Sequence, residues 1–151
     1  MRIGVPKEIK NHEYRVGMTP AAVREAVHHG HEAVAQAGAG SAIGRDDAAY
    51  LAAGAQVLPN AAAVFESAQM IVKVKEPQPA ECAMLRRGQL LFTYLHLAPD
   101  PVQAEGLLNS GCTAIAYETI TDERGGLPLL APMSEVAGRM AIQVGAVALQ
   151  K

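Results

Sequence analysis

Three residues of the sequence offer charge or proton-transfer chemistry, and each follows or ends an apolar, strand-like segment. Arg15 lies in the charged loop 10–15, Lys75 ends the segment 71–75, and His96 ends the segment 89–96. Ligands of open α/β sheets bind in the crevice at the carboxyl ends of the strands. We therefore expect these three side chains to meet at one edge of one sheet.

A guanidinium, an ammonium and an imidazole at one site suit a small α-keto or α-amino acid. Arginine holds a carboxylate with two parallel hydrogen bonds, and lysine places a compact positive charge beside a polarised carbonyl. Histidine exchanges a proton near neutral pH. Taken singly, Arg15 and Lys75 are as well explained as solvated charges and His96 as a structural residue, so the prediction depends on the set.

The segments that must position these residues alternate between strand-like and helix-like patterns. This alternation predicts an α/β fold, a Rossmann-like open and mostly parallel sheet with helices on both faces. Helices are expected to begin after Thr19, Asn60 and Asp100, which are good N-cap residues, and Gln103 stands at the capping-box position. A long, apolar helix is expected over 133–150. Strands are expected at 2–5, 32–36, 71–75, 89–96 and 112–117.

Three further motifs have a plainer interpretation than the functional one. The segment 38–44 has the spacing G-x-G-x-x-x-G, and 45–47 does not open an apolar helix, so we predict a loop and not a dinucleotide site. The histidines of 28–31 lack cysteine or carboxylate partners at ligand spacing, which favours a helix end over a metal site. Cys82 and Cys112 lie in no activating motif and are expected to be ordinary thiols.

Composition narrows the function classes further. The 151 residues carry a formal net charge of -2 and are half apolar, which is typical of a globular domain. A nucleic-acid partner is not expected because no basic face is evident. No apolar run approaches the roughly 20 residues that cross a bilayer, so no membrane association is expected. Residues 1–7 do not resemble a signal peptide, and we expect a cytoplasmic protein.

The sequence resembles the alanine dehydrogenase/pyridine nucleotide transhydrogenase family, and alanine dehydrogenases in particular, in register over essentially its whole length. The matching motifs include Gly-Val-Pro-Lys-Glu-Ile-Lys at 4–10, Arg-Val at 15–16, Thr-Pro at 19–20, Gly-Ala-Gly at 38–40, Lys-Val-Lys-Glu-Pro at 73–77, Tyr-Leu-His-Leu-Ala at 94–98, Thr-Ala-Ile-Ala-Tyr-Glu-Thr at 113–119 and Pro-Met-Ser-Glu-Val-Ala-Gly at 132–138.

The resemblance implies NAD-dependent interconversion of L-alanine with pyruvate and ammonia. It implies that Arg15 grips the substrate carboxylate and that Lys75 contacts the carboxylate or the carbonyl oxygen. His96 would be the acid/base that moves protons as an iminium becomes a carbinolamine and then a ketone, and Tyr94 would line the pocket.

The resemblance also implies a domain organisation. Residues 1–132 would form the substrate-binding α/β domain, incomplete without a returning C-terminal segment. Residues 133–151 would begin the helix that leads to an absent NAD-binding domain, with Met133 and Ser134 approaching the cofactor. The chain is therefore expected to be inactive alone, and a homo-oligomer is expected because the family forms hexamers.

Two other interpretations stay open at this point. The chain could be a non-enzymatic remnant or oligomerisation module whose apolar final helix mediates assembly. It could also be a fragment of the nucleotide-binding subunit of transhydrogenase, which shares the fold. The presence of both Lys75 and His96, with Tyr94 beside His96, favours the dehydrogenase.

Overall fold

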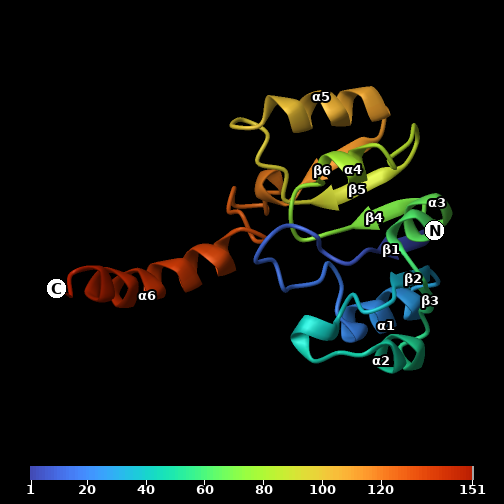
Figure 1. Cartoon of the computed structure of the whole chain (residues 1–151), viewed down its shortest axis with the longest axis horizontal. Helices are drawn as coiled ribbons and strands as arrows, with labels where there is room; N and C mark the ends of the chain where they lie inside the picture. Colours follow the sequence, from blue (N-terminus) through green and yellow to red (C-terminus); the bar gives the residue numbers. More distant parts are fainter. Residues whose placement is uncertain (151) are drawn as a thin grey trace. The chain divides into compact units, whose positions relative to one another are not determined.

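A six-stranded sheet organises the chain, and the computed structural model describes residues 1–150. The strand order is β3-β2-β1-β4-β5-β6, and β1 pairs in parallel with both β2 and β4 (Figure 1). The pairs β2–β3 and β4–β5 are parallel as well. This arrangement confirms the expected Rossmann-like fold class. The strands are β1 Arg2–Val5, β2 Glu32–Gln36, β3 Gln56–Leu58, β4 Met70–Val72, β5 Leu90–Thr93 and β6 Thr113–Ala116.

Helices follow the strands in alternation, and side chains expected to cap them do so. The Thr19 hydroxyl, the Asn60 amide oxygen and the Asp100 carboxylate each accept a hydrogen bond from a backbone N–H in the first helical turn. These three N-termini were predicted from local sequence alone. The helices are α1 Pro20–His28, α2 Asp47–Ala52, α3 Ala61–Ser67, α4 Pro79–Cys82, α5 Pro101–Ser110 and α6 Ala131–Ala148, with 3-10 turns at Ser41–Ile43 and Tyr117–Thr119.

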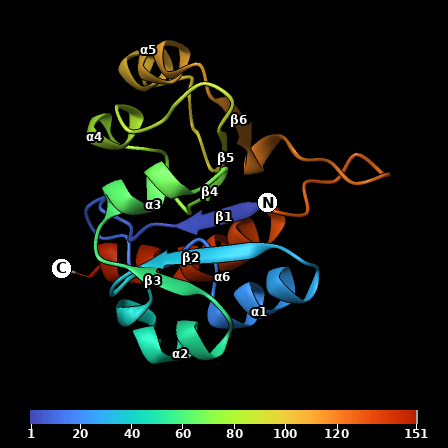
Figure 2. The same cartoon turned by 90° about the vertical axis from the view of Figure 1, so that its right-hand side faces the viewer.

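The two faces of the sheet are covered by different helices. Successive strand residues point to opposite faces, so Val5 and Gly4 of β1 look in opposite directions. Val5 belongs to a core cluster that includes Val23 of α1 and Tyr50 of α2. A side chain at Gly4 would instead meet Val64 and Ala68, which belong to α3 and its C-terminal end. The helices α1 and α2 thus pack on one face, beside β2 and β3, and α3 packs on the other (Figure 2).

Several boundaries differ from the sequence-based expectation. The strand expected over 71–75 ends at Val72, and the Val74 nitrogen donates to the Glu8 carboxylate and not to a neighbouring strand. The strand expected over 89–96 ends at Thr93. The prediction that 45–47 does not open an apolar helix is wrong, since Asp46 caps α2, which is mostly apolar beyond Asp47. Gln103 does not complete a capping box and instead donates from its buried amide to the Leu95 carbonyl.

The chain divides into two compact units, the first over Met1–Ile115 and the second from Ala116 onward. The first unit contains β1 to β5 with α1 to α5. The second contains α6 and a turn at 122–126, in which the Asp122 carboxylate accepts hydrogen bonds from two backbone N–H groups. Over residues 1–150, none of the helices combines the length and apolarity needed to cross a membrane.

One glycine fixes the loop after β1 against the sheet. A Cβ at Gly17 would lie 2.3 Å from the Val72 carbonyl oxygen and 2.9 Å from the Lys73 nitrogen, a clash with backbone that cannot move aside. The loop that carries Arg15 can therefore reach the end of β4 only with glycine at this position.

We predict that Gly17→Ala lowers the free energy of unfolding by about 3 kcal/mol, because the added methyl forces the loop away from β4. Urea denaturation followed by circular dichroism measures the loss. Gly138→Ala in α6 is the matched control, since a Cβ there meets nothing within 4 Å. A Gly17→Ala variant as stable as the control would show that the close approach carries no stability.

Candidate functional site

Arg15 projects from the loop after β1 and is oriented by a carboxylate two residues earlier. Glu13 accepts hydrogen bonds from the Arg15 Nε at 2.8 Å, from its Nη2 at 2.7 Å and from its backbone nitrogen at 2.9 Å. The hydrogen bond from Arg15 lowers the pKa of Glu13, and the same bond raises the pKa of Arg15. Both groups are therefore charged at neutral pH, and the guanidinium plane is set by Glu13.

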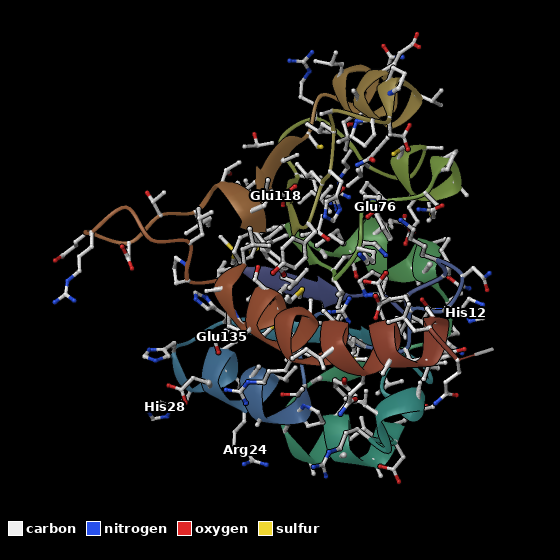
Figure 3. All side chains as sticks on the ribbon, turned by 90° about the vertical axis from the view of Figure 1, so that its left-hand side faces the viewer. His12, Arg24, His28, Glu76, Glu118 and Glu135 are labelled. Carbon is white, nitrogen blue, oxygen red and sulfur yellow. The ribbon has the colours of Figure 1, made fainter. Side chains whose placement is uncertain are left out.

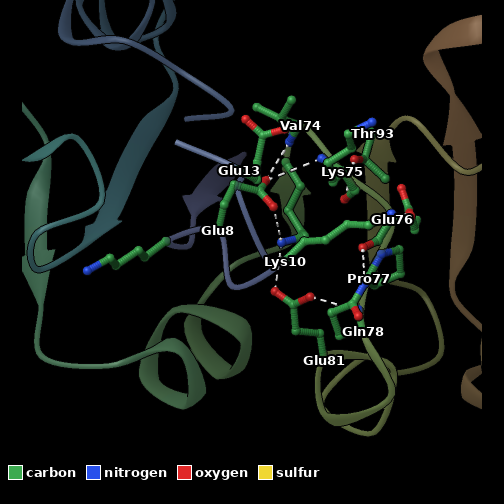
Figure 4. Close-up of polar contacts among 12 residues, drawn as sticks. Glu8, Lys10, Glu13, Val74, Lys75, Glu76, Pro77, Gln78, Glu81 and Thr93 are labelled. Carbon is green, nitrogen blue, oxygen red and sulfur yellow. Dashed lines mark hydrogen bonds and ion pairs between the residues drawn. The ribbon is translucent and has the colours of Figure 1, made fainter. Parts of the chain in front are cut away.

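Lys75 lies just beyond β4, and its backbone is held from two sides. A carboxylate oxygen of Glu8 accepts from the Val74 nitrogen at 2.6 Å and from the Lys75 nitrogen at 3.4 Å (Figure 4). The Thr93 hydroxyl donates to the Lys75 carbonyl at 2.8 Å. Backbone pairing also continues beside these bonds, since the Tyr94 nitrogen donates to the Val74 carbonyl at 3.3 Å. Together the bonds fix the point from which the half-buried Lys75 side chain extends.

Beneath this segment lies a fully buried ion triad. The Lys73 ammonium is 3.0 Å from Glu8 and 2.7 Å from Glu81, and all three side chains are at most 2% exposed. The second oxygen of Glu81 accepts from the Gln78 nitrogen at 2.8 Å (Figure 4). Buried charges persist only when paired and hydrogen-bonded. The triad therefore ties together the loop after β1, the end of β4 and helix α4.

His96 lies beyond β5 and contacts two other side chains of the site. Its Nδ1 is 3.3 Å from a carboxylate oxygen of Glu76, and its ring stacks on Tyr94 with centroids 5.8 Å apart and planes at 15°. Lys10 pairs with the other oxygen of Glu76. The Tyr94 ring is buried whereas His96 is exposed, so one face of the imidazole packs against a buried aromatic ring.

Arg15, Lys75, Tyr94 and His96, the residues predicted from the sequence to form the substrate site, all belong to the first unit. The charge of Tyr94 contributes to raising the pKa of Arg15, and the charge of Lys75 contributes to lowering the pKa of Glu13. Tyr94 in turn stacks on His96. Along the chain, Arg15, Lys75 and His96 thus follow β1, β4 and β5, and their meeting around one ligand stays a prediction.

The two residues expected near a cofactor lie elsewhere in the chain. Met133 and Ser134 belong to the first turn of α6, in the second unit. The Ser134 hydroxyl contacts the Leu130 carbonyl at 3.5 Å, as is common for serine in a helix. Their assignment to a cofactor stays a prediction.

Sequence reasoning missed the carboxylates of the site. Glu8, Glu13 and Glu76 each pair with a cation or with His96, and Glu81 joins the buried triad. A signal for them existed, because the loop after β1 and the segment 73–77 both mix acids with bases. A lysine inside an apolar, β-branched run, as at Lys73, is also a sign of a buried partner.

The remaining motifs have structural roles. The Gly38 nitrogen donates to the Asp47 carboxylate at 2.7 Å, within a loop and a 3-10 turn. His28 and Arg24 protrude from α1 (Figure 3), and His29 pairs with Glu25 one turn earlier. Within residues 1–150, no group of three or more histidine, cysteine or acidic side chains is placed to hold a metal ion.

A separate cavity of about 860 Å³ lies between α4 and α5 and contains none of the predicted residues. Cys82 lines it, and burial raises the pKa of this thiol, with the nearby Glu81 charge adding to the effect. Cys82 and Cys112 are both unpaired thiols, as expected. Arg86, Arg87 and Asp100 also line this cavity, but the residues that the sequence assigns to a substrate follow β1, β4 and β5, and we take that region as the candidate site.

Comparison with known proteins identifies relatives over the full chain. Residues 4–137 match the family model described as the N-terminal domain of alanine dehydrogenase/PNT. The chain is 58% identical to alanine dehydrogenase of Halomonas elongata and 54% identical to that of Mycobacterium tuberculosis, over all 151 residues in both cases. It spans 41% of the length of either relative.

Two solved structures are similar to the chain, and they differ in how closely they match it. One structure, of an L-alanine dehydrogenase, superimposes with a TM-score of 0.91 at 52% identity, over 97% of this chain and 40% of that one. A transhydrogenase from Sinorhizobium meliloti superimposes with a TM-score of 0.73 at 27% identity, over 78% of this chain and 35% of that one. The chain is thus more similar to the former.

The buried triad yields a stability prediction. Lys73→Met removes the only cation of the triad and leaves Glu8 and Glu81 facing each other without compensation. We expect the free energy of unfolding to fall by about 4 kcal/mol, as measured by urea denaturation at pH 7.

Glu25→Gln is the control, because it breaks an exposed pair and should cost less than about 0.5 kcal/mol. Adding Glu8→Gln and Glu81→Gln to the Lys73→Met chain should recover part of the loss. A Lys73→Met chain that loses under about 1 kcal/mol would contradict a role for the triad in fixing the site.

Proposed function

The chain belongs to the alanine dehydrogenase/PNT family through its N-terminal domain, and from this premise we propose that it is the substrate-binding part of an L-alanine dehydrogenase. The reaction would be the NAD-dependent, reversible conversion of L-alanine to pyruvate and ammonia. The observation that supports this most directly is that Arg15, Lys75 and His96 follow β1, β4 and β5, three neighbouring strands of the parallel sheet.

Arg15 would bind the substrate carboxylate. A guanidinium carries five N–H donors in a planar fork, and the pair with Glu13 takes the Nε donor and one on Nη2. The planar fork of a guanidinium matches the geometry of a carboxylate such as that of the substrate. Glu13 therefore orients the fork before substrate arrives, which lowers the entropic cost of binding.

Lys75 and His96 would act on the reacting carbon. The Lys75 ammonium stabilises negative charge on the pyruvate carbonyl oxygen or on the carboxylate. In the oxidative direction His96 takes a proton from the water that adds to the iminium carbon, which gives a carbinolamine. His96 then gives this proton to the amino group. As the C–N bond breaks and ammonia leaves, His96 takes the proton of the hydroxyl group, and the carbonyl of pyruvate forms.

NAD is proposed as the cofactor, with Met133 and Ser134 as contacts. When bound, it would accept the hydride from the substrate carbon. The segment 38–44 does not fit a dinucleotide, because the Asp47 carboxylate already occupies the Gly38 amide and would repel a pyrophosphate. We therefore propose residues 1–132 as the substrate-binding domain and 133–151 as the start of a helix toward a nucleotide-binding domain.

A homo-oligomeric assembly is proposed on the surface of α6. Apolar side chains such as Ile142, Val147 and Leu149 are between 66% and 84% exposed along this helix. Contiguous exposed apolar surface is a feature of protein–protein contacts. The transhydrogenase alternative is supported less well, since the match to that fold is lower in both identity and TM-score.

Pyruvate binding tests the proposed function. We expect pyruvate to bind this chain, with Arg15→Lys lowering the affinity about tenfold, because lysine keeps the charge but loses the bidentate fork. Isothermal titration calorimetry measures both affinities. Arg24→Lys on the outer surface of α1 is the control and should leave binding unchanged. Equal pyruvate affinities for the wild-type chain and Arg15→Lys would contradict the proposal that Arg15 binds the substrate carboxylate.

Light scattering tests the role of α6. We expect a molar mass above the 15.9 kDa of one chain, and Ile142→Glu with Val147→Glu should shift it toward the monomer because charge is costly in an apolar contact. Leu108→Glu on α5 is the control, since Leu108 is 81% exposed on a different element. A wild-type chain that is monomeric at all concentrations would contradict assembly through α6.

A further inference from the structure

We propose that Glu76 is a positioning residue that fixes which nitrogen of His96 carries the proton. The inference rests on the proposed function only in assigning proton transfer to His96. It adds a role for a side chain that the substrate would not touch. The geometry of Glu76, His96 and their neighbours carries it.

The position of the carboxylate determines the tautomer. The Glu76 Oε2 is 3.3 Å from His96 Nδ1, and an ionised carboxylate can only accept hydrogen bonds. Nδ1 must therefore carry a hydrogen, and in the neutral imidazole this places the lone pair on Nε2. A general base needs its lone pair on the nitrogen that exchanges the proton, so Glu76 selects Nε2 for that task.

Glu76 is well placed to hold this orientation. Its side chain is 11% exposed, and its other oxygen is paired with Lys10 from the loop after β1. Its carbonyl accepts from the Gln78 amide, and the next residue is Pro77, which restricts the Glu76 backbone to extended conformations. Glu76 is thus held at its backbone and at one carboxylate oxygen, and the other carboxylate oxygen accepts the hydrogen bond from the imidazole.

The backbone of His96 supports the same interpretation. Its φ of 46° lies in the left-handed region, which non-glycine residues seldom adopt. Such a conformation is maintained only where surrounding contacts over-determine it. Stacking on Tyr94 and the bond to Glu76 are two such contacts. The stacking fixes the plane of the His96 ring, and the bond fixes which edge of the ring faces Glu76.

The tautomer can be read directly by NMR on this chain labelled with ¹⁵N-histidine, at a pH where the imidazoles are neutral. We expect wild-type His96 to carry its proton on Nδ1. Glu76→Leu should lose that signal and move the proton to Nε2, because the carboxylate that accepts from Nδ1 is then absent. Glu76→Gln should keep the Nδ1 proton, because the amide oxygen still accepts.

The chain contains a matched control in Glu25→Gln, which alters a second Glu–His pair, that of Glu25 with His29 on α1. This variant should leave the His96 signals unchanged. The signals of the other four histidines report whether each variant is folded.

A wild-type His96 protonated on Nε2 would overturn the proposal without any variant, so the test holds even if Glu76→Leu does not fold. A folded Glu76→Leu chain that keeps the proton on Nδ1 would overturn it too. Adding pyruvate to the wild-type chain separates the two proposals. Unchanged His96 signals on addition of pyruvate would count against the proposed function, whereas the tautomer measured without ligand decides the role of Glu76.

Discussion

The burial of the Lys73 ammonium between Glu8 and Glu81 is the constraint on which the rest of the site depends. The three groups come from the loop after β1, the end of β4 and helix α4, and each is at most 2% exposed. A buried charge without its partner costs several kcal/mol, so none of these segments can move away alone. The loop that carries Arg15 and the segment that carries Lys75 are consequently fixed to each other.

Each group proposed to meet the substrate is supported by a carboxylate. Glu13 sets the guanidinium of Arg15, Glu8 holds the backbone at Lys75, and Glu76 holds the ring of His96. The supporting groups lie deeper than the groups they hold, because a carboxylate that is partly desolvated orients its partner more strongly. Functional groups held in this way lose little freedom when a ligand binds, which is how a preorganised site gains affinity and rate.

Features held by contacts between residues close in sequence could be predicted from the sequence, whereas features held by contacts between distant residues could not. The caps at Thr19, Asn60 and Asp100 were predicted because a cap bonds within three residues of itself. The short helices α2 and α4 were not predicted, since helices of 6 and 4 residues are held by tertiary contacts.

One such tertiary contact is the bond from the Tyr50 hydroxyl to the Met18 carbonyl. The carboxylates of the site were missed for a related reason. Glu8 meets Lys73 across 65 positions, and Glu76 meets His96 across 20. Pairs this far apart in sequence cannot be predicted from residue spacing. Arg15, Lys75 and His96, which these carboxylates support, could be predicted because each follows a strand.

The position of Arg15, Lys75 and His96 after strand ends has a topological cause. The chain begins at β1 in the middle of the sheet, runs outward through β2 and β3, and then crosses back to add β4, β5 and β6 on the other side. The connections leaving β1 and β4 therefore diverge at their carboxyl ends, which is where open α/β sheets bind their ligands. Arg15 follows β1, Lys75 follows β4 and His96 follows β5, so the order of the groups across the site is the order of the strands. Neighbouring parallel strands lie about 5 Å apart, a spacing that lets three adjacent strand ends address a ligand of only three carbons.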